Sequence, residues 1–197
     1  HTDTDRLQLT IEDESIGYML ETDFHKAQTR RRLRDLMKTQ PGERIDELLG
    51  QLVAASGVDI PKEPPSWERP ANWDQLRSLE ARGLRIAPHS RSHRILSTLT
   101  DEECEQEIRY STERVRMELK DPAPVFCYPT GRASDFGERE IDIVKNLGFR
   151  GAVSSIPGSA RKKPPSNDYV FQLPRYELPE DPVRFHQYNS WVEAVRS

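Results

Sequence analysis

From Asn72 onward the chain alternates between amphipathic segments and short apolar runs, and this alternation constrains its fold more than any other feature. Glycine or proline follows most of these segments, so their ends are marked. The predicted helices are 72–83, 100–119 and 136–147, and the predicted strands are 84–87, 125–128, 149–154 and 169–173. Such alternation favours parallel strands with helices outside them, so we expect an α/β sheet or barrel.

Residues 1–71 lack this alternation of helices and short strands, and we interpret them as a separate part of the chain. Residues 5–20 alternate apolar and polar side chains at period two and predict a β-hairpin, and helical patterns follow at 24–39 and 43–56. Residues 58–71 contain four prolines and predict an irregular connector. We therefore divide the chain into 1–71, a hairpin with helices and connector, and 72–197, a β/α core with a C-terminal tail. The tail is expected to hold one helix, around Trp191 and Val195.

Composition excludes some classes of function. The 197 residues carry a formal net charge of −4, which gives no general case for binding nucleic acid. No apolar run approaches the length of a membrane span, and no signal peptide is visible. The chain begins with histidine rather than methionine, so its localisation stays open. Its two cysteines, Cys104 and Cys127, form no metal-binding motif.

A pair of histidines follows the first predicted strand of the core. His89 and His93 lie four residues apart, and imidazoles at that spacing can converge on one divalent cation such as zinc if the backbone turns between them. Such a pair also arises by chance in a chain with five histidines. The hypothesis of a site at this pair is strengthened because two other predicted strands also end in residues typical of active sites. These are Tyr128-Pro129-Thr130-Gly131 and Arg175, and the carboxyl ends of neighbouring parallel strands share one face.

These residues resemble a known family. The quoted elements are Trp73-Asp74-Gln75-Leu76, Gly83-Leu84-Arg85-Ile86, His89-Ser90-Arg91-Ser92-His93, Glu107-Ile108, Phe126-Cys127-Tyr128-Pro129-Thr130-Gly131 and Gly148-Phe149-Arg150-Gly151-Ala152. In this order they resemble the polysaccharide deacetylase family, also called the NodB homology domain or carbohydrate esterase family 4, over roughly residues 72–178. His-[Ser/Thr]-x-x-His followed by Phe-x-Tyr-Pro-x-Gly is a specific combination.

The resemblance implies a distorted (β/α) barrel and an enzyme that hydrolyses N-acetyl groups on a glycan. It implies a divalent metal, commonly zinc, on two histidines and one aspartate, with a second aspartate as general base. Residue by residue, His89 and His93 match the metal ligands, and the backbone N–H of Thr130 matches a donor to the oxyanion. Arg175 matches an arginine that orients the base. His186 is the sole downstream candidate for the closing general acid, although no apolar strand precedes it.

The chain departs from the family pattern at its start. The family's first motif, Thr-Phe-Asp-Asp-Gly, supplies the third ligand and the base, and these 197 residues do not contain it. Thr10-Ile11-Glu12-Asp13-Glu14 is a look-alike, but no helix followed by an Ala-Thr-Phe-Phe type strand comes after it. We expect instead that the chain starts inside the domain, beyond the first strands, with residues 5–60 as an insertion. We then expect weak metal binding, little activity and an unpaired sheet edge that favours a homo-oligomer.

Several alternatives stay open. The chain can be a non-catalytic glycan-binding or interaction module on the same fold. Arg30 to Arg34 can form a phosphate-binding patch, and the basic helix 24–39 can bind an acidic partner, although a solvated helix face is the simpler explanation. Trp67 and Trp191 can stack on sugar rings, whereas Trp73 is expected in the core. Tyr128 is expected to lie half in the core and half at the rim of the site.

Overall fold

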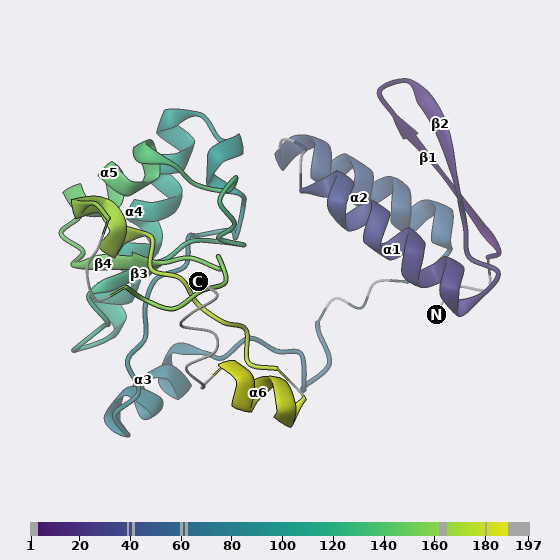
Figure 1. The fold of residues 1–197 in the computed structure, drawn as a ribbon. Helices are drawn as coiled ribbons and strands as arrows, with labels where there is room; N and C mark the ends of the chain where they lie inside the picture. The colour runs from purple at the N-terminus through teal and green to yellow at the C-terminus, as the bar shows by residue number, and fades with distance from the viewer. Residues whose placement is uncertain are drawn as a thin grey trace. The chain divides into compact units, whose positions relative to one another are not determined.

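The structure, a computed structural model, describes residues 4–38, 40, 42–59, 61, 63–161, 165–179 and 181–188. The chain divides into two units, His1–Pro70 and Ala71–Ser197, and each is described by itself (Figure 1). No helix among the described residues is long and apolar enough to cross a membrane.

The first unit is a β-hairpin packed on two helices. Its elements are β1 (Arg6–Ile11), β2 (Glu14–Met19), α1 (Asp23–Met37) and α2 (Gly42–Ser56). The strands pair antiparallel, and the turn between them is Glu12-Asp13, with φ of 49° and 67°. Two consecutive residues with positive φ match the right-handed twist of a two-residue hairpin. The hairpin and both predicted helices are therefore confirmed.

Alternation along β1 produces the core of this unit. Every second residue of the strand is buried and packs with residues of β2, α1 and α2. The buried set is Leu7, Leu9, Ile11, Tyr18, Leu20, Leu33 and Leu48. The arginines of Arg30–Arg34 are exposed on α1, as a solvated helix face would be.

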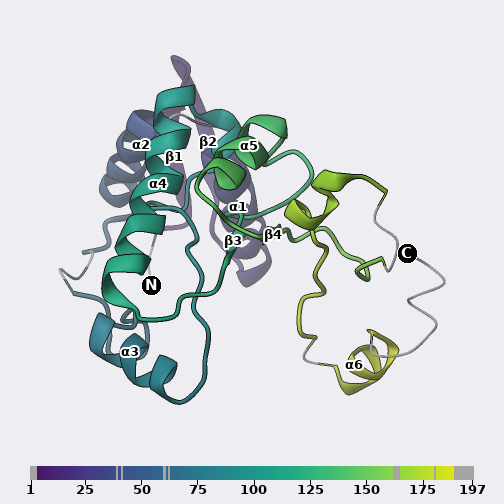
Figure 2. The same ribbon diagram turned by 90° about the vertical axis from the view of Figure 1, so that its left-hand side faces the viewer.

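The second unit contains the predicted helix and strand alternation, with two exceptions. Its elements are α3 (Trp73–Ala81), η1 (Leu96–Thr98), α4 (Asp101–Glu118), β3 (Val125–Cys127), α5 (Glu138–Asn146), β4 (Gly151–Val153), η2 (Asn167–Phe171) and α6 (Pro182–Tyr188). β3 and β4 pair in parallel, and α4 and α5 pack over them (Figure 2). Asn72 and Thr100 each cap their helix within a capping box, at the starts predicted for these two helices.

The predicted strand 84–87 is wrong as a regular strand. This segment runs beside β3 in the same direction, since the Ala123 N–H donates to the Ile86 carbonyl at 2.8 Å and the Cys127 N–H donates to the Pro88 carbonyl at 3.1 Å. The two bonds are two residues apart on one segment and four apart on the other, so no regular ladder forms.

The predicted strand 169–173 is also wrong. Residues 167–171 form the 3-10 helix η2, and only Leu173 makes a parallel bridge, to Val153. Gly151 makes room for this turn, because a Cβ at that position would lie 2.6 Å from the Val170 carbonyl oxygen. An ion pair of 2.7 Å from Lys145 to Asp168 ties η2 to α5. Among the described residues the sheet does not close into a barrel.

One core holds α4 and α5 on the sheet of the second unit. Its buried residues come from η1, α4, β3, α5 and β4. They are Leu96, Leu99, Cys104, Ile108, Phe126, Tyr128, Phe136, Ile141, Val144, Phe149 and Ala152. The expected helix around Trp191 and Val195 lies outside the described residues, and α6 precedes it.

Candidate active site

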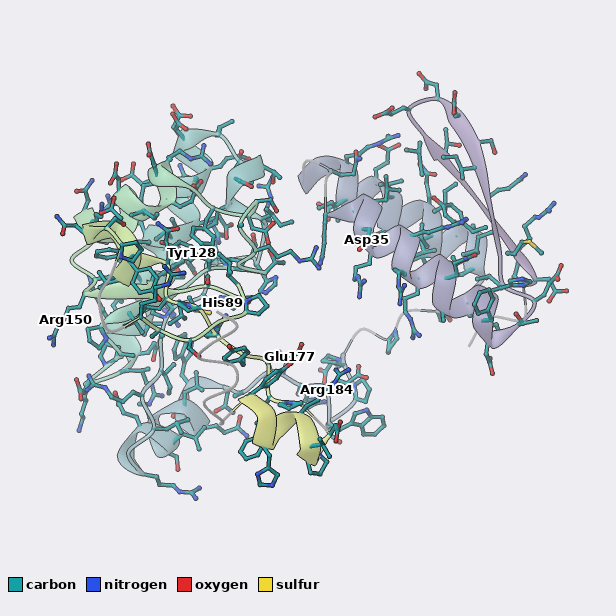
Figure 3. All side chains as sticks on the ribbon, viewed as in Figure 1. Asp35, His89, Tyr128, Arg150, Glu177 and Arg184 are labelled. Atoms are coloured by element: carbon teal, nitrogen blue, oxygen red, sulfur yellow. The ribbon has the colours of Figure 1, made fainter. Side chains whose placement is uncertain are left out.

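The two histidines lie beyond the carboxyl end of β3. His89 directly follows the segment that borders β3, and in Figure 3 it lies at the opposite end of the two strands from Arg150, which precedes β4. We call residues 89–93 the histidine loop. The imidazole rings of His89 and His93 approach with centroids 4.8 Å apart and planes at 79°. Both side chains are exposed, so a small ligand can reach them.

The tautomer of His89 follows from its partner. Its Nδ1 lies 2.8 Å from the Cys127 carbonyl oxygen, and a carbonyl can only accept a hydrogen bond. Nδ1 therefore carries the proton, and in the neutral ring Nε2 keeps its lone pair. A histidine that ligates a metal usually gives its other ring N–H to such an oxygen, which fixes the ring orientation. His89 is therefore arranged as a ligand through Nε2.

The backbone of the histidine loop turns through two left-handed residues. Ser90 has a φ of 63° and His93 a φ of 60°, and the His93 N–H donates to the Ser90 Oγ at 3.0 Å. A left-handed residue other than glycine costs on the order of 1 kcal/mol or more. The turn that brings the rings together therefore needs support from elsewhere in the structure.

Glu107 on α4 supplies that support. Its carboxylate is buried, and Oε2 accepts the N–H groups of Arg91 at 3.0 Å and Ser92 at 2.8 Å. Oε1 accepts the Ser92 hydroxyl at 2.7 Å. Sequence analysis gave Glu107 no role of its own. The available signal was a charged residue three positions after Cys104 and four before Ser111, on the buried face of α4.

A second loop, residues 128–135, follows β3 and carries Thr130. The Gly131 N–H donates to the Pro129 carbonyl, which makes a tight turn around Thr130 with a φ of 52°. Gly131 itself has a φ of 65°, and a Cβ there would lie 2.9 Å from the Ser155 backbone nitrogen. The Thr130 N–H makes no hydrogen bond with another described residue, so it is available to a ligand.

Asp135 holds this second loop from within. Its buried carboxylate accepts the Thr130 hydroxyl, and it accepts the Arg132 N–H at 2.9 Å through the same oxygen. Its other oxygen accepts the Ser134 hydroxyl at 2.9 Å. Sequence analysis missed Asp135, although an acid a few residues after a Pro-x-Gly turn is a signal that it can close the turn.

Tyr128 corrects an expectation. The side chain is fully buried and stacks on Phe136 with ring centroids 4.0 Å apart, so it belongs to the core and not to the rim. Its hydroxyl has no hydrogen-bond partner among the described residues. Burial, and next the charge of Glu140, raise the pKa of this phenol, so it stays neutral.

Arg175 lies at the third strand end. Its Nε donates to the Ser154 carbonyl at 2.6 Å, and one terminal nitrogen donates to the Ser155 hydroxyl at 3.2 Å. It also neighbours Cys127. Burial raises the pKa of this thiol, and the positive charge of Arg175 reduces the shift. Arg175 pairs with no carboxylate among the described residues, so nothing in them tests its expected role toward a base.

Two further candidate residues lie on other elements. His186 is exposed on α6, and its ring contact is with the adjacent Phe185. Asp13 lies in the hairpin turn of the first unit. No group of three or more His, Cys, Asp or Glu side chains among the described residues is arranged to hold a metal ion.

The described residues leave the expected stacking of Trp67 and Trp191 on sugar rings untested. Trp67 is 81% exposed in the connector, and Trp191 lies outside the described residues. Trp73 is half-buried rather than in the core, because it lies at the start of α3 with the Arg114 guanidinium 5.6 Å from its ring.

Comparison with known proteins places the fold. A family model described as "Polysaccharide deacetylase" matches residues 48–152, which include the histidine loop and Thr130. Among solved structures the chain is similar to a Streptococcus pyogenes deacetylase, PplD, in complex with acetate, with a TM-score of 0.53 and 16% identity. The likeness covers 64% of this chain and 53% of that one, so this chain spans about half its length. No curated protein matches the chain.

Proposed function

This chain belongs to the polysaccharide deacetylase family, and from that membership we propose that its second unit removes acetyl groups from the N-acetylated sugars of a glycan. The reaction is hydrolysis of an amide carbon–nitrogen bond. We propose further that the unit is part of a distorted (β/α) barrel of the family type. Parallel pairing of β3 and β4, with α4 and α5 packed over them, supports this proposal.

The main support for this proposal is the close approach of the His89 and His93 rings, together with the hydrogen bond that orients His89. Two imidazoles with centroids 4.8 Å apart, one with its Nδ1 proton given to a carbonyl, fit two ligand positions of a divalent cation, most suitably zinc. His89 and His93 would hold it. When bound, such a cation is a Lewis acid that polarises a carbonyl and lowers the pKa of water.

The chain's own residues take the remaining roles. The Thr130 N–H, which has no described partner, donates to the oxygen of the acetyl group as negative charge develops on it. Asp135 holds Thr130 in the left-handed conformation that sets this N–H. Arg175, anchored on Ser154 and Ser155, brings positive charge to the same strand ends, from where it would orient a carboxylate base.

The third ligand and the general base have no assigned residue in this chain. Catalytic zinc sites usually have three protein ligands, so two histidines should bind the metal weakly. Loss of a general base costs about 10²–10⁴ in rate. We therefore propose that the chain by itself is a weakly active deacetylase.

Two measurements test this function together: zinc binding, and acetate release from N-acetylated chito-oligosaccharides. Saturable zinc binding and slow acetate release, both lost in the double variant His89→Ala, His93→Ala, are the expected results. His186→Ala is the matched control for metal binding, because this exposed histidine lies on α6 and should leave zinc affinity unchanged. Zinc binding that survives the double variant contradicts the assignment.

A second candidate is a non-catalytic glycan-binding module on the same fold. It is favoured by the lack of a three-ligand cluster among the described residues. Retained binding of the oligosaccharide without zinc binding or acetate release supports this reading over the first.

A further inference from the structure

The donors to Glu107 all come from the histidine loop. Its two oxygens accept two successive backbone N–H groups and the hydroxyl of Ser92. These donors belong to Arg91 and Ser92, two of the three residues between the candidate ligands. The carboxylate therefore fixes the peptide units on which the separation of the two imidazoles depends.

An ordinary ion pair does not explain this buried carboxylate. The two arginines in and beside the loop have other partners: the Arg91 guanidinium lies 4.5 Å from the Tyr110 ring, and Arg94 pairs with Glu103 at 3.2 Å. Glu107 itself makes no ion pair among the described residues. Its charge is satisfied by donors from the loop, and hydrogen bonds to an ionised acceptor are the stronger kind.

The loop needs this support because its geometry is unfavourable on its own. Ser90 and His93 are both left-handed, and neither is glycine. Without the carboxylate the backbone can relax toward commoner conformations, and the two rings then lose their fixed separation. A site with two ligands gains most from such preorganisation, since no third ligand restricts it.

We propose that Glu107 is a positioning residue that sets the spacing of His89 and His93 for cation binding. This inference rests on the proposed function, because it assumes that the histidine pair binds a metal. It adds a residue on α4 that touches neither the cation nor the substrate.

The test compares zinc affinity in variants of buried and exposed carboxylates. Glu107→Gln keeps the size of the side chain, but it removes the negative charge and replaces one of the two accepting oxygens by an NH2 group. We expect zinc affinity to fall about 10-fold, the lower end of the effect of removing groups that orient metal ligands. Glu113→Gln, an exposed change on the same helix, should leave affinity unchanged.

A purely structural role is separated by Glu140→Gln. Glu140 is equally buried and accepts the Gly137 N–H at 2.7 Å, but it does not touch the histidine loop. This variant should lower thermal stability while zinc affinity stays within about twofold. Equal loss of affinity in Glu107→Gln and Glu140→Gln, or unchanged affinity in Glu107→Gln, overturns the proposal. If Glu107→Gln does not fold, Glu107→Asp, which keeps the charge but withdraws the oxygens, should show a smaller loss, and wild-type affinity in it overturns the proposal.

The proposed function and this inference fail in different ways. Lack of saturable zinc binding by the unchanged chain contradicts the proposed function. The effect of Glu107 on the loop can be measured in the metal-free protein, by hydrogen exchange of the Arg91 and Ser92 amides. Exchange at these amides should be faster in Glu107→Gln by about 10-fold or more. Unchanged exchange at these two amides overturns the inference.

Discussion

The histidine loop is held by a carboxylate from a helix, Glu107 on α4, whereas the loop after β3 is held by its own Asp135. Glu107 lies 15 residues from Ser92 in the sequence, and Asp135 lies five residues from Thr130. Each carboxylate is buried and receives three donors from its loop. Both loops are thus held by a buried carboxylate, but the carboxylate is distant in the sequence for the histidine loop and close for the 128–135 loop.

This difference determines what each loop depends on. The 128–135 loop contains its own carboxylate, and the N–H groups of Ser97 and Ser155 donate to its backbone carbonyls, so it depends on η1 and on the end of β4. The histidine loop depends on α4, because Glu107 comes from that helix. Damage to the packing of α4 should therefore reach the metal ligands before it reaches Thr130.

The largest expected effect is at Gly131, where the 128–135 loop contacts the neighbouring backbone closely. Alanine at this φ of 65° is strained, and its Cβ would lie 2.9 Å from a backbone nitrogen and 3.1 Å from a backbone oxygen. We expect Gly131→Ala to lower the free energy of unfolding by about 2–4 kcal/mol, combining strain with overpacking. Urea unfolding measures this loss.

Gly148→Ala is the matched control. Gly148 has a φ of 80°, but a Cβ there would meet no atom within 4 Å. Strain alone should cost about 1 kcal/mol. Equal losses at the two glycines would show that the close approach at Gly131 is unimportant.

The next effect separates the two loops directly. Asp135→Asn removes the negative charge and replaces one accepting oxygen by an NH2 group, so the bonds from Thr130, Arg132 and Ser134 lose their charged acceptor. We expect a loss of about 2 kcal/mol in the free energy of unfolding. Zinc affinity should stay within about twofold, because the histidine loop has a different support. Asp142→Asn, an exposed change on α5, should alter neither quantity. A tenfold loss of zinc affinity in Asp135→Asn would mean that the loops are coupled.

Local signals made much of this fold predictable. Capping residues placed α3 and α4, and the apolar runs before Pro129 and after Gly148 placed β3 and β4. The histidine pair was found from its spacing and its place after a strand-like run. These features depend on residues close together in the sequence.

The wrong or missing predictions concern residues whose structure depends on contacts with segments distant in the sequence. Residues 84–87 resemble a strand, but their two bonds to the neighbouring segment come from Ala123 and Cys127, four residues apart, so no regular ladder forms. Residues 169–173 resemble one too, but Gly151 admits the η2 turn. Glu107 is a charged residue on a buried helix face, and its three donors could be known only after α4 and the histidine loop had been placed together.

Alkaline pH offers a third test, because α4 packs on α5 through Cys104. Its thiol is buried and lies 3.5 Å from the Glu140 carboxylate. Burial, and next that charge, raise the pKa of Cys104 from 9.0 to about 12. The unfolded chain therefore loses this proton first, so stability is unaffected below pH 9 and falls as the pH rises from about 9 to about 12.

Cys104→Ala should flatten this decline. At pH 10 the unfolding free energies of variant and unchanged chain, each relative to pH 8, should differ by about 1 kcal/mol, since one pKa unit corresponds to about 1.4 kcal/mol. An identical decline in both proteins would exclude Cys104 as its cause.

The smallest expected effect refines the description of the histidine loop itself. Ser92→Ala removes the hydroxyl bond of 2.7 Å to Glu107 but leaves the two backbone N–H bonds on the other oxygen. A single bond of this kind is worth about 1 kcal/mol, so zinc affinity should fall by at most about fivefold, less than in Glu107→Gln. Ser78→Ala, an exposed change on α3, is the control and should leave affinity unchanged. If Ser92→Ala weakens zinc binding as much as Glu107→Gln does, the hydroxyl and not the pair of backbone amides is the contact that positions the histidines.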